Sequence, residues 1–95
     1  MERITTTIKR QWLAKIIAKT KKIEYREMKA YWRKRLEGMK VPFELRMING
    51  MQKKCPEVTV VIKKIKKNLK DRVYELHIKK IKSFKNWDAR RERPR

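Results

Sequence analysis

The segment 57–67, EVTVVIKKIKK, constrains the fold more than any other part of the chain. Its β-branched residues favour a strand, and its centre is apolar enough for that strand to be covered on both faces. The polar turn NLKDR follows, and then comes the segment 73–84, VYELHIKKIKSF, which directs Tyr74, Leu76 and Ile78 inward. The two segments therefore predict a pair of long partner strands.

Upstream of this pair, short strands alternate with short helices. Strands are predicted where apolar residues recur at every second position: 4–9, 22–27 and 42–48, the last with Phe43, Leu45 and Met47 on one face. Helices are predicted where apolar residues recur at helical spacing: from Arg10 to about Thr20, and along the stripe from Met28 to Met39. This order predicts an α+β fold, a small mixed β-barrel of about five strands with two short helices.

The chain is long enough for one small domain, and its composition is strongly basic. Residues 1–84 carry the predicted elements, and residues 85–95, KNWDARRERPR, are predicted to be a basic tail that is loose at its end. Lysines and arginines number 30 against 10 acidic residues, which gives a formal net charge of +20. That excess favours a polyanionic partner: nucleic acid, an anionic membrane surface or an acidic protein.

Several classes of protein are disfavoured by what the sequence lacks. Cys55 is the only cysteine, so no internal disulfide can form, which is compatible with a reducing compartment. No apolar run approaches the roughly 20 residues that a membrane span needs, and residues 1–12 lack an apolar signal core. His77, the only histidine, has no cysteine or histidine at metal-ligand spacing. We therefore expect a cytoplasmic protein that binds no membrane, metal or cofactor.

The central part of the chain contains a recognisable motif. IIAKTKKIEYRE (16–27), followed by KAYWRKRLEG (29–38), resembles the ASCH domain family, in which a helix leads into Gly-x-Lys-x-x-Glu-x-Arg. Lys21, Glu24 and Arg26 occupy its three polar positions. LRMINGMQKKCPEVTVVIKKI (45–65) is similar to the segment of small family members in which an Arg-Asn-Gly turn precedes a proline and a long strand. The resemblance covers about residues 10–81 and implies a PUA-like β-barrel.

The chain departs from the family pattern at four positions: Lys19 replaces the motif glycine, Ile48 stands where a basic residue is common, Met51 stands where an aromatic residue is often found, and Glu24 stands where one branch has a threonine. The resemblance implies an association with RNA, through binding or through ribonuclease activity. One bacterial branch hydrolyses the acetyl group of 4-acetylcytidine with a motif lysine and that threonine. Lys21 matches the lysine, but Glu24 disfavours the amidohydrolase hypothesis.

Lys21, Glu24 and Arg26 have two interpretations. Charges at alternate positions of a strand commonly form a solvated face, and here Ile23 and Tyr25 face the other way. If the three residues form a site, Glu24 is expected to bond the Arg26 guanidinium and fix its fork towards a phosphate or a base edge. Lys21, crowded by the charges of neighbouring basic residues, is then the candidate general base or nucleophile, with Glu24 assisting.

Aromatic residues divide into a predicted core and a predicted surface. Trp12 and Trp32 lie on the apolar stripes of their helices and are expected in the core. Tyr31 and Arg35, four residues apart, are expected to offer a ring and a guanidinium for stacking on bases. Trp87 follows the last strand and either stacks on a base or covers the end of the barrel.

The sequence therefore predicts a nucleic-acid-binding module that prefers RNA, with lysine and arginine clusters that contact phosphates. Lys21, Glu24, Arg26 and Asn49 are expected to shape a polar central pocket. The candidate RNA-binding residues are Lys21, Lys22, Glu24, Arg26, Tyr31, Arg33, Arg35, Asn49, Lys53, Lys63, Lys64, Lys66, Lys67, Lys70, Arg90 and Arg91. Two alternatives stay open. One is a small hydrolase acting on RNA or modified nucleosides, with Lys21 and Glu24 as catalytic residues; the other is an accessory protein of a ribonucleoprotein with no chemistry in its pocket.

Overall fold

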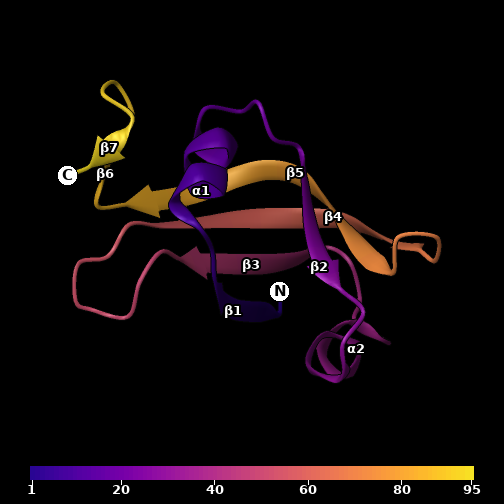
Figure 1. The fold of residues 1–95 in the computed structure, drawn as a ribbon. Helices are drawn as coiled ribbons and strands as arrows, with labels where there is room; N and C mark the ends of the chain where they lie inside the picture. The colour runs from indigo at the N-terminus through magenta and orange to yellow at the C-terminus, as the bar shows by residue number, and fades with distance from the viewer.

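A five-stranded sheet that curls into an open half-barrel forms the centre of the fold (Figure 1). The computed structural model describes residues 1–95. Its strands are β1 (Arg3–Thr7), β2 (Ile23–Glu27), β3 (Phe43–Ile48), β4 (Glu57–Asn68) and β5 (Val73–Lys85). They lie in the order β1-β3-β4-β5-β2, with β1 parallel to β3 and every other neighbouring pair antiparallel. The predicted α+β fold with a mixed sheet of five strands is thus confirmed, and β1 and β2 are its two free edges.

The long pair β4–β5 holds the sheet together, as the sequence predicted. The two strands contain 12 and 13 residues, and they pair from Glu57 opposite Lys85 to Asn68 opposite Val73. Every residue from Val58 to Ile62 is buried, which confirms that this part of β4 is covered on both faces. One face packs on the apolar core, and the other carries ion pairs between neighbouring strands.

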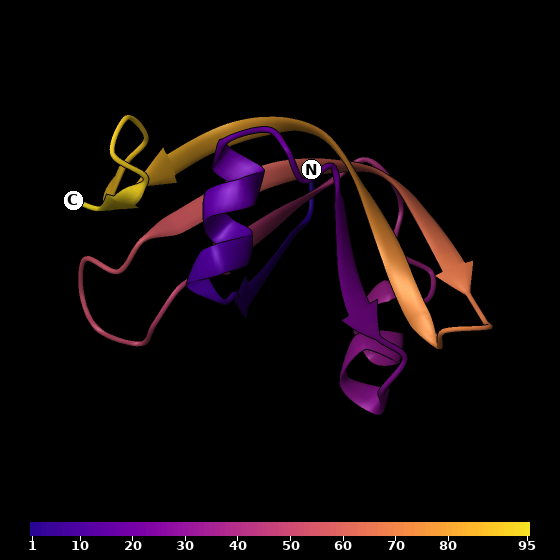
Figure 2. The ribbon, with the colours of Figure 1, turned by 45° about the horizontal axis from the view of Figure 1, so that its top comes forward.

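Two short helices pack against the sheet. The first, α1 (Arg10–Ile17), lies on the inner side of the curved sheet, and α2 (Ala30–Leu36) lies beyond the end of β2 (Figure 2). The first helix ends earlier than predicted because Lys19 adopts a left-handed backbone with φ of 65°. The second begins later because Lys29 is extended. Neither helix has the length and apolar composition that crossing a membrane would require.

The core lies between the inner face of the sheet and the two helices. Its buried side chains are Ile4, Ile8, Leu13, Ile16, Ile17, Trp32, Leu36, Phe43, Leu45, Met47, Val58, Val60, Ile62, Tyr74, Leu76 and Trp87. The predicted face of Phe43, Leu45 and Met47 is confirmed, because all three are fully buried. Burying side chains of this size is the main favourable contribution to folding in a chain this short.

The C-terminal segment is not the loose tail that the sequence predicted. Trp87 is only 3% exposed and belongs to the core, so it covers the end of the sheet. Two short strands, β6 (Trp87–Asp88) and β7 (Arg93–Pro94), then pair with each other. The Asn86 side chain donates a hydrogen bond to the Cys55 carbonyl at 3.0 Å. The burial of one large aromatic side chain therefore orders a segment whose composition is otherwise charged.

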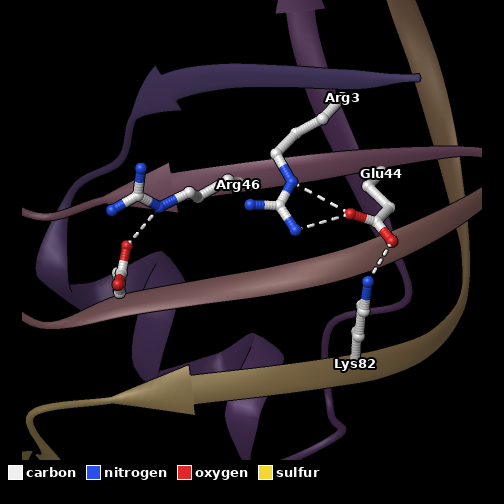
Figure 3. A network of polar contacts seen from close by, with 5 residues as sticks. Arg3, Glu44, Arg46 and Lys82 are labelled. Carbon is white, nitrogen blue, oxygen red and sulfur yellow. Dashed lines mark hydrogen bonds and ion pairs between the residues drawn. The ribbon is translucent and has the colours of Figure 1, made fainter. Parts of the chain in front are cut away.

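Ion pairs cover the face of the sheet opposite the core (Figure 3). The Glu44 carboxylate lies between Arg3 and Lys82, and accepts hydrogen bonds from Arg3 at 2.9 and 2.7 Å and from Lys82 at 2.5 Å. On the next row, Arg46 Nε donates to Glu57 at 2.6 Å. These contacts join β1, β3, β4 and β5, so the outer face of the sheet is held by charge pairs between strands.

The free energy of unfolding is expected to decrease as the pH is lowered. Hydrogen bonds from Lys82 and Arg3 lower the pKa of Glu44, and hydrogen bonds from Lys67 and Tyr74 lower the pKa of Glu37. Because both pKa values are lower folded than unfolded, this stabilisation is complete above about pH 4.3 and is lost as the pH falls through the folded values.

Thermal unfolding between about pH 6 and about pH 3 tests this expectation. We expect the Tm of the unmodified chain to decrease over that range, and the Tm of a Glu44→Gln variant to decrease less. Identical pH dependence of the two proteins would contradict the role given to Glu44.

Candidate functional site

The two free edges of the half-barrel are linked by one side chain. No backbone ladder joins β1 to β2. Instead, Arg26 of β2 reaches across the gap, where Nη2 donates to the Thr7 carbonyl at 3.0 Å and Nη1 lies 3.5 Å from the Thr6 hydroxyl. We call the gap between β1 and β2 the seam. The Arg26 guanidinium closes it, and both edge strands bring polar groups to it.

The polar face of β2 points towards the inside of this seam. Glu24 is only 5% exposed, whereas Tyr25, the next residue, is 51% exposed. The predicted alternation is confirmed, and the solvated-face interpretation is wrong for Glu24. The Glu24 carboxylate of β2 can be buried here because neighbouring polar groups form hydrogen bonds and ion pairs with it.

Lys21, Glu24 and Arg26 converge, as the motif predicted. Glu24 Oε2 lies 2.5 Å from Arg26 Nη2, and Glu24 Oε1 lies 3.4 Å from Lys21 Nζ. The expected bond between Glu24 and the Arg26 guanidinium is thus confirmed. The Lys21 amine also donates to the Ile23 carbonyl at 2.6 Å. The carboxylate is consequently held between two cations.

A cleft of about 640 Å³ opens along the seam, which is a typical volume for a small-molecule site. Its lining residues are Thr7, Ile8, Lys9, Trp12, Glu24, Tyr25, Arg26, Glu27, Lys29, Trp32 and Asn49. Rings therefore form part of its walls, and the Glu24–Arg26 pair provides its central polar groups. Lys21 does not line the cleft: its amine lies 5.3 Å from the Trp12 ring centre and 5.0 Å from that of Tyr25.

Asn49 joins the cleft as the sequence predicted. Its Nδ2 donates to the Ile8 carbonyl at 2.9 Å, and its Oδ1 accepts from Arg10 Nε at 3.2 Å. Its backbone N–H donates to the Pro56 carbonyl at 2.8 Å. The residue therefore fixes the turn after β3 against the end of β1, and its amide forms one wall of the cleft.

Trp12 is the site residue that sequence reasoning placed wrongly. It was expected in the core but is 38% exposed and lines the cleft. The buried stripe of α1 consists of Leu13, Ile16 and Ile17, so the helix turns Trp12 to the rim. Lys15 Nζ lies 5.1 Å from its ring centre, a cation–π contact. The apolar spacing alone did not distinguish the centre of the stripe from its edge.

Trp32 also lines the cleft, whereas Tyr31, whose ring centre lies 5.2 Å from that of Trp32, does not. Trp32 is buried, as predicted, and the Arg26 guanidinium lies 5.1 Å from its ring centre. Tyr31 is exposed, and the Arg35 guanidinium lies 3.5 Å from its ring centre, so the two side chains stack on each other. A second hollow of about 570 Å³ lies beside Tyr31, and Arg26 and Trp32 line both hollows.

Most of the predicted phosphate-binding residues do not line the cleft. They lie on exposed positions of the β3–β4 loop, of β4, of the β4–β5 turn, of α2 and of the C-terminal hairpin: Arg33, Arg35, Lys53, Lys63, Lys64, Lys66, Lys67, Lys70, Arg90 and Arg91. Only eight of the 30 lysines and arginines form an ion pair with a carboxylate. The surface of the protein therefore carries a large excess of unpaired positive charge.

Comparison with known proteins finds no match among protein families, curated proteins or solved structures. No group of three or more histidine, cysteine, aspartate or glutamate side chains could hold a metal ion. The geometry of the cleft and the positive charge of the protein are therefore the basis for a proposed function.

Proposed function

We propose that the chain binds nucleic acid, with a preference for RNA, and that an unpaired base enters the cleft between β1 and β2. The observation that carries this proposal is the combination of Trp12, Tyr25 and Trp32 rings with the Glu24–Arg26 pair in one cleft. Unstacked bases are bound by rings or guanidinium planes on their faces and by hydrogen bonds at their edges. The cleft offers both kinds of group within one hollow.

Each side chain has a definite role in this proposal. The exposed ring of Trp12 stacks on the base, and the buried ring of Trp32 supports the Arg26 guanidinium from behind. The Glu24 carboxylate, already oriented by Arg26, accepts a hydrogen bond from an exocyclic amino group of a base. Lysines on the surrounding surface neutralise the phosphates and contribute affinity that does not depend on sequence.

The same features support membership of the ASCH family and a PUA-like fold. The mixed half-barrel, its two helices and the convergence of Lys21, Glu24 and Arg26 are what that resemblance implies. Lys19 replaces the motif glycine yet adopts the left-handed conformation that a glycine readily takes. The substitution is therefore compatible with the turn that the motif needs.

Binding has more support than hydrolysis. A catalytic lysine must reach the substrate, but Lys21 does not line the cleft and donates to a backbone carbonyl. Both carboxylate oxygens of Glu24 already contact a cation. We therefore propose a binding module, and RNA incubated with it should keep its length.

Salt is expected to weaken this binding strongly. If at least about five phosphates are neutralised, the logarithm of the affinity for single-stranded RNA should fall with the logarithm of salt concentration with a slope of about −3.5 or steeper. Fluorescence anisotropy of a labelled oligonucleotide at several sodium chloride concentrations measures this slope, and DNA of the same sequence measures the preference for RNA. A flat salt response, or no binding at low salt, would contradict the proposal.

A further inference from the structure

A second groove, of about 610 Å³, lies between the C-terminal end of α1, the segment that follows it, and β5. Its lining residues are Ile16, Ile17, Lys19, Lys21, Lys22, Ile78, Lys79, Lys80, Ile81, Lys82, Ser83 and Phe84. We call it the lysine groove. Six of its twelve residues are lysines and none is acidic, so it attracts an anionic partner.

The positive charge of the lysine groove is largely unpaired. Lys19, Lys22, Lys79 and Lys80 are exposed and form no ion pair. Lys21 and Lys82 do form ion pairs, but their carboxylates belong to residues outside the groove, Glu24 and Glu44. Four of the six lysines therefore have no carboxylate partner.

The floor of the lysine groove is aliphatic. Isoleucines from α1 and β5 form it, and Phe84, 41% exposed, is its only aromatic residue. It contains no arginine. Bases are bound on rings and guanidinium planes, which this chain gathers at the cleft instead. The groove is thus better suited to aliphatic side chains than to bases.

A free strand edge runs along the lysine groove. The β2–β5 ladder ends with Ile23 opposite His77, and the last main-chain contact on this side is from Ile78 N to the Lys22 carbonyl at 2.9 Å. Beyond it, the rest of β5 pairs only with β4, and register shifts leave Lys79 and Lys82 without a partner residue in that ladder. A free edge is complementary to the backbone of an added strand, whose regular alternation of donors and acceptors nucleic acid does not reproduce.

We propose that the lysine groove binds an extended acidic segment of a partner protein, which adds as a strand to the edge of β5. Alternate residues of that segment would be apolar and pack on Ile81 and Phe84, and acidic residues between them would pair with the lysines. Another copy of this chain is disfavoured, because its own edge carries the same lysines. This site is separate from the cleft and does not depend on RNA binding.

A labelled ten-residue peptide of alternating glutamate and valine tests the proposal. We expect saturable binding that weakens about tenfold or more in a Lys79→Glu/Lys80→Glu variant, because reversing two charges in the groove repels the peptide. The matched control is Lys63→Glu/Lys66→Glu, which makes the same change of net charge at exposed positions of β4 outside the groove. This control variant should weaken peptide binding by less than about threefold, because it changes only the long-range electrostatic attraction between protein and peptide.

Two further peptides test the strand itself. One peptide is methylated on the backbone nitrogens of its odd residues, and the other on those of its even residues, so both keep every charge. In an added strand, only the odd or only the even N–H groups can point towards β5. One methylated peptide should therefore bind about tenfold or more weakly, and the other should bind almost normally. Equal binding of both peptides, equal losses in the two charge-reversal variants, or no saturable binding would overturn the proposal. So would a groove variant that loses RNA affinity while it keeps peptide affinity.

Discussion

Replacing Arg26 with alanine is expected to weaken binding to single-stranded RNA by about 1–3 kcal/mol, roughly 5- to 150-fold. The guanidinium closes the seam to Thr7, orients Glu24 and lines both hollows. Its removal leaves the buried carboxylate of Glu24 with only Lys21 as a partner. Because both the shape and the polarity of the cleft change, the loss should differ between RNA sequences. Anisotropy titrations with several oligonucleotides measure it.

Lys70→Ala is the matched control, because it removes one positive charge at an exposed turn position with no ion pair. Its effect should be smaller, equal for all sequences, and visible as a reduction of about 0.7 in the salt slope. A second variant, Glu24→Gln with Arg26→Met, avoids an uncompensated buried carboxylate and shows whether the loss of affinity comes from misfolding. Equal weakening by Arg26→Ala and Lys70→Ala would mean that the motif acts only as part of the general positive field.

Replacing Trp12 with alanine is expected to weaken RNA binding without unfolding the protein. Removal of one stacking ring costs about 1–3 kcal/mol of affinity, roughly 5- to 150-fold. Trp12 is not part of the buried core, so the Tm of the Trp12→Ala variant should differ little from that of the unmodified protein. Titrations and thermal unfolding of the same preparation measure the two effects.

The other tryptophan of the cleft provides the contrast. Trp32→Ala removes a buried core side chain and should cost about 3–5 kcal/mol of the free energy of unfolding. Trp12→Phe keeps a ring at the rim and should keep most of the affinity that Trp12→Ala loses. If Trp12→Ala lowers the Tm as much as Trp32→Ala, or leaves RNA affinity unchanged, the role of Trp12 as an exposed stacking ring is wrong.

The elements that sequence analysis predicted well are those set by local periodicity. The strand 57–67 and its partner 73–84 match β4 and β5 closely, because alternation over many residues leaves few other structures open. The buried positions of Trp32 and of Phe43 follow for the same reason, since each lies at the centre of an apolar face. Local pattern therefore predicted the element order and most of the core.

The features that the sequence did not predict depend on how distant parts of the chain pack against one another. The seam exists because β1 pairs in parallel with β3 while β2 pairs with β5, which leaves two edges for Arg26 to link. No local pattern specifies that pairing. Trp12 was misplaced, and the role of Trp87 was left open, for a related reason, since the position of a helix rim or a chain end depends on what packs beside it.

The motif itself gave a partial prediction. Its three polar residues converge, and Glu24 bonds Arg26 as expected. What the spacing could not predict is the direction of the Lys21 amine, which bends back to the Ile23 carbonyl and two aromatic rings instead of entering the cleft. That direction is what separates the binding hypothesis from the catalytic one.

The central claim, that a base enters the cleft, is tested most directly by NMR of the indole N–H signals of the three tryptophans during titration with single-stranded RNA. Trp12 and Trp32 line the cleft, whereas Trp87 is buried outside it and is an internal control. Inorganic polyphosphate, a polyanion without bases, is the control for charge. We expect RNA, but not polyphosphate, to shift the Trp12 and Trp32 signals in a saturable manner while the Trp87 signal stays in place. Unchanged signals of Trp12 and Trp32 at saturating RNA, or equal shifts with RNA and polyphosphate, would contradict the claim.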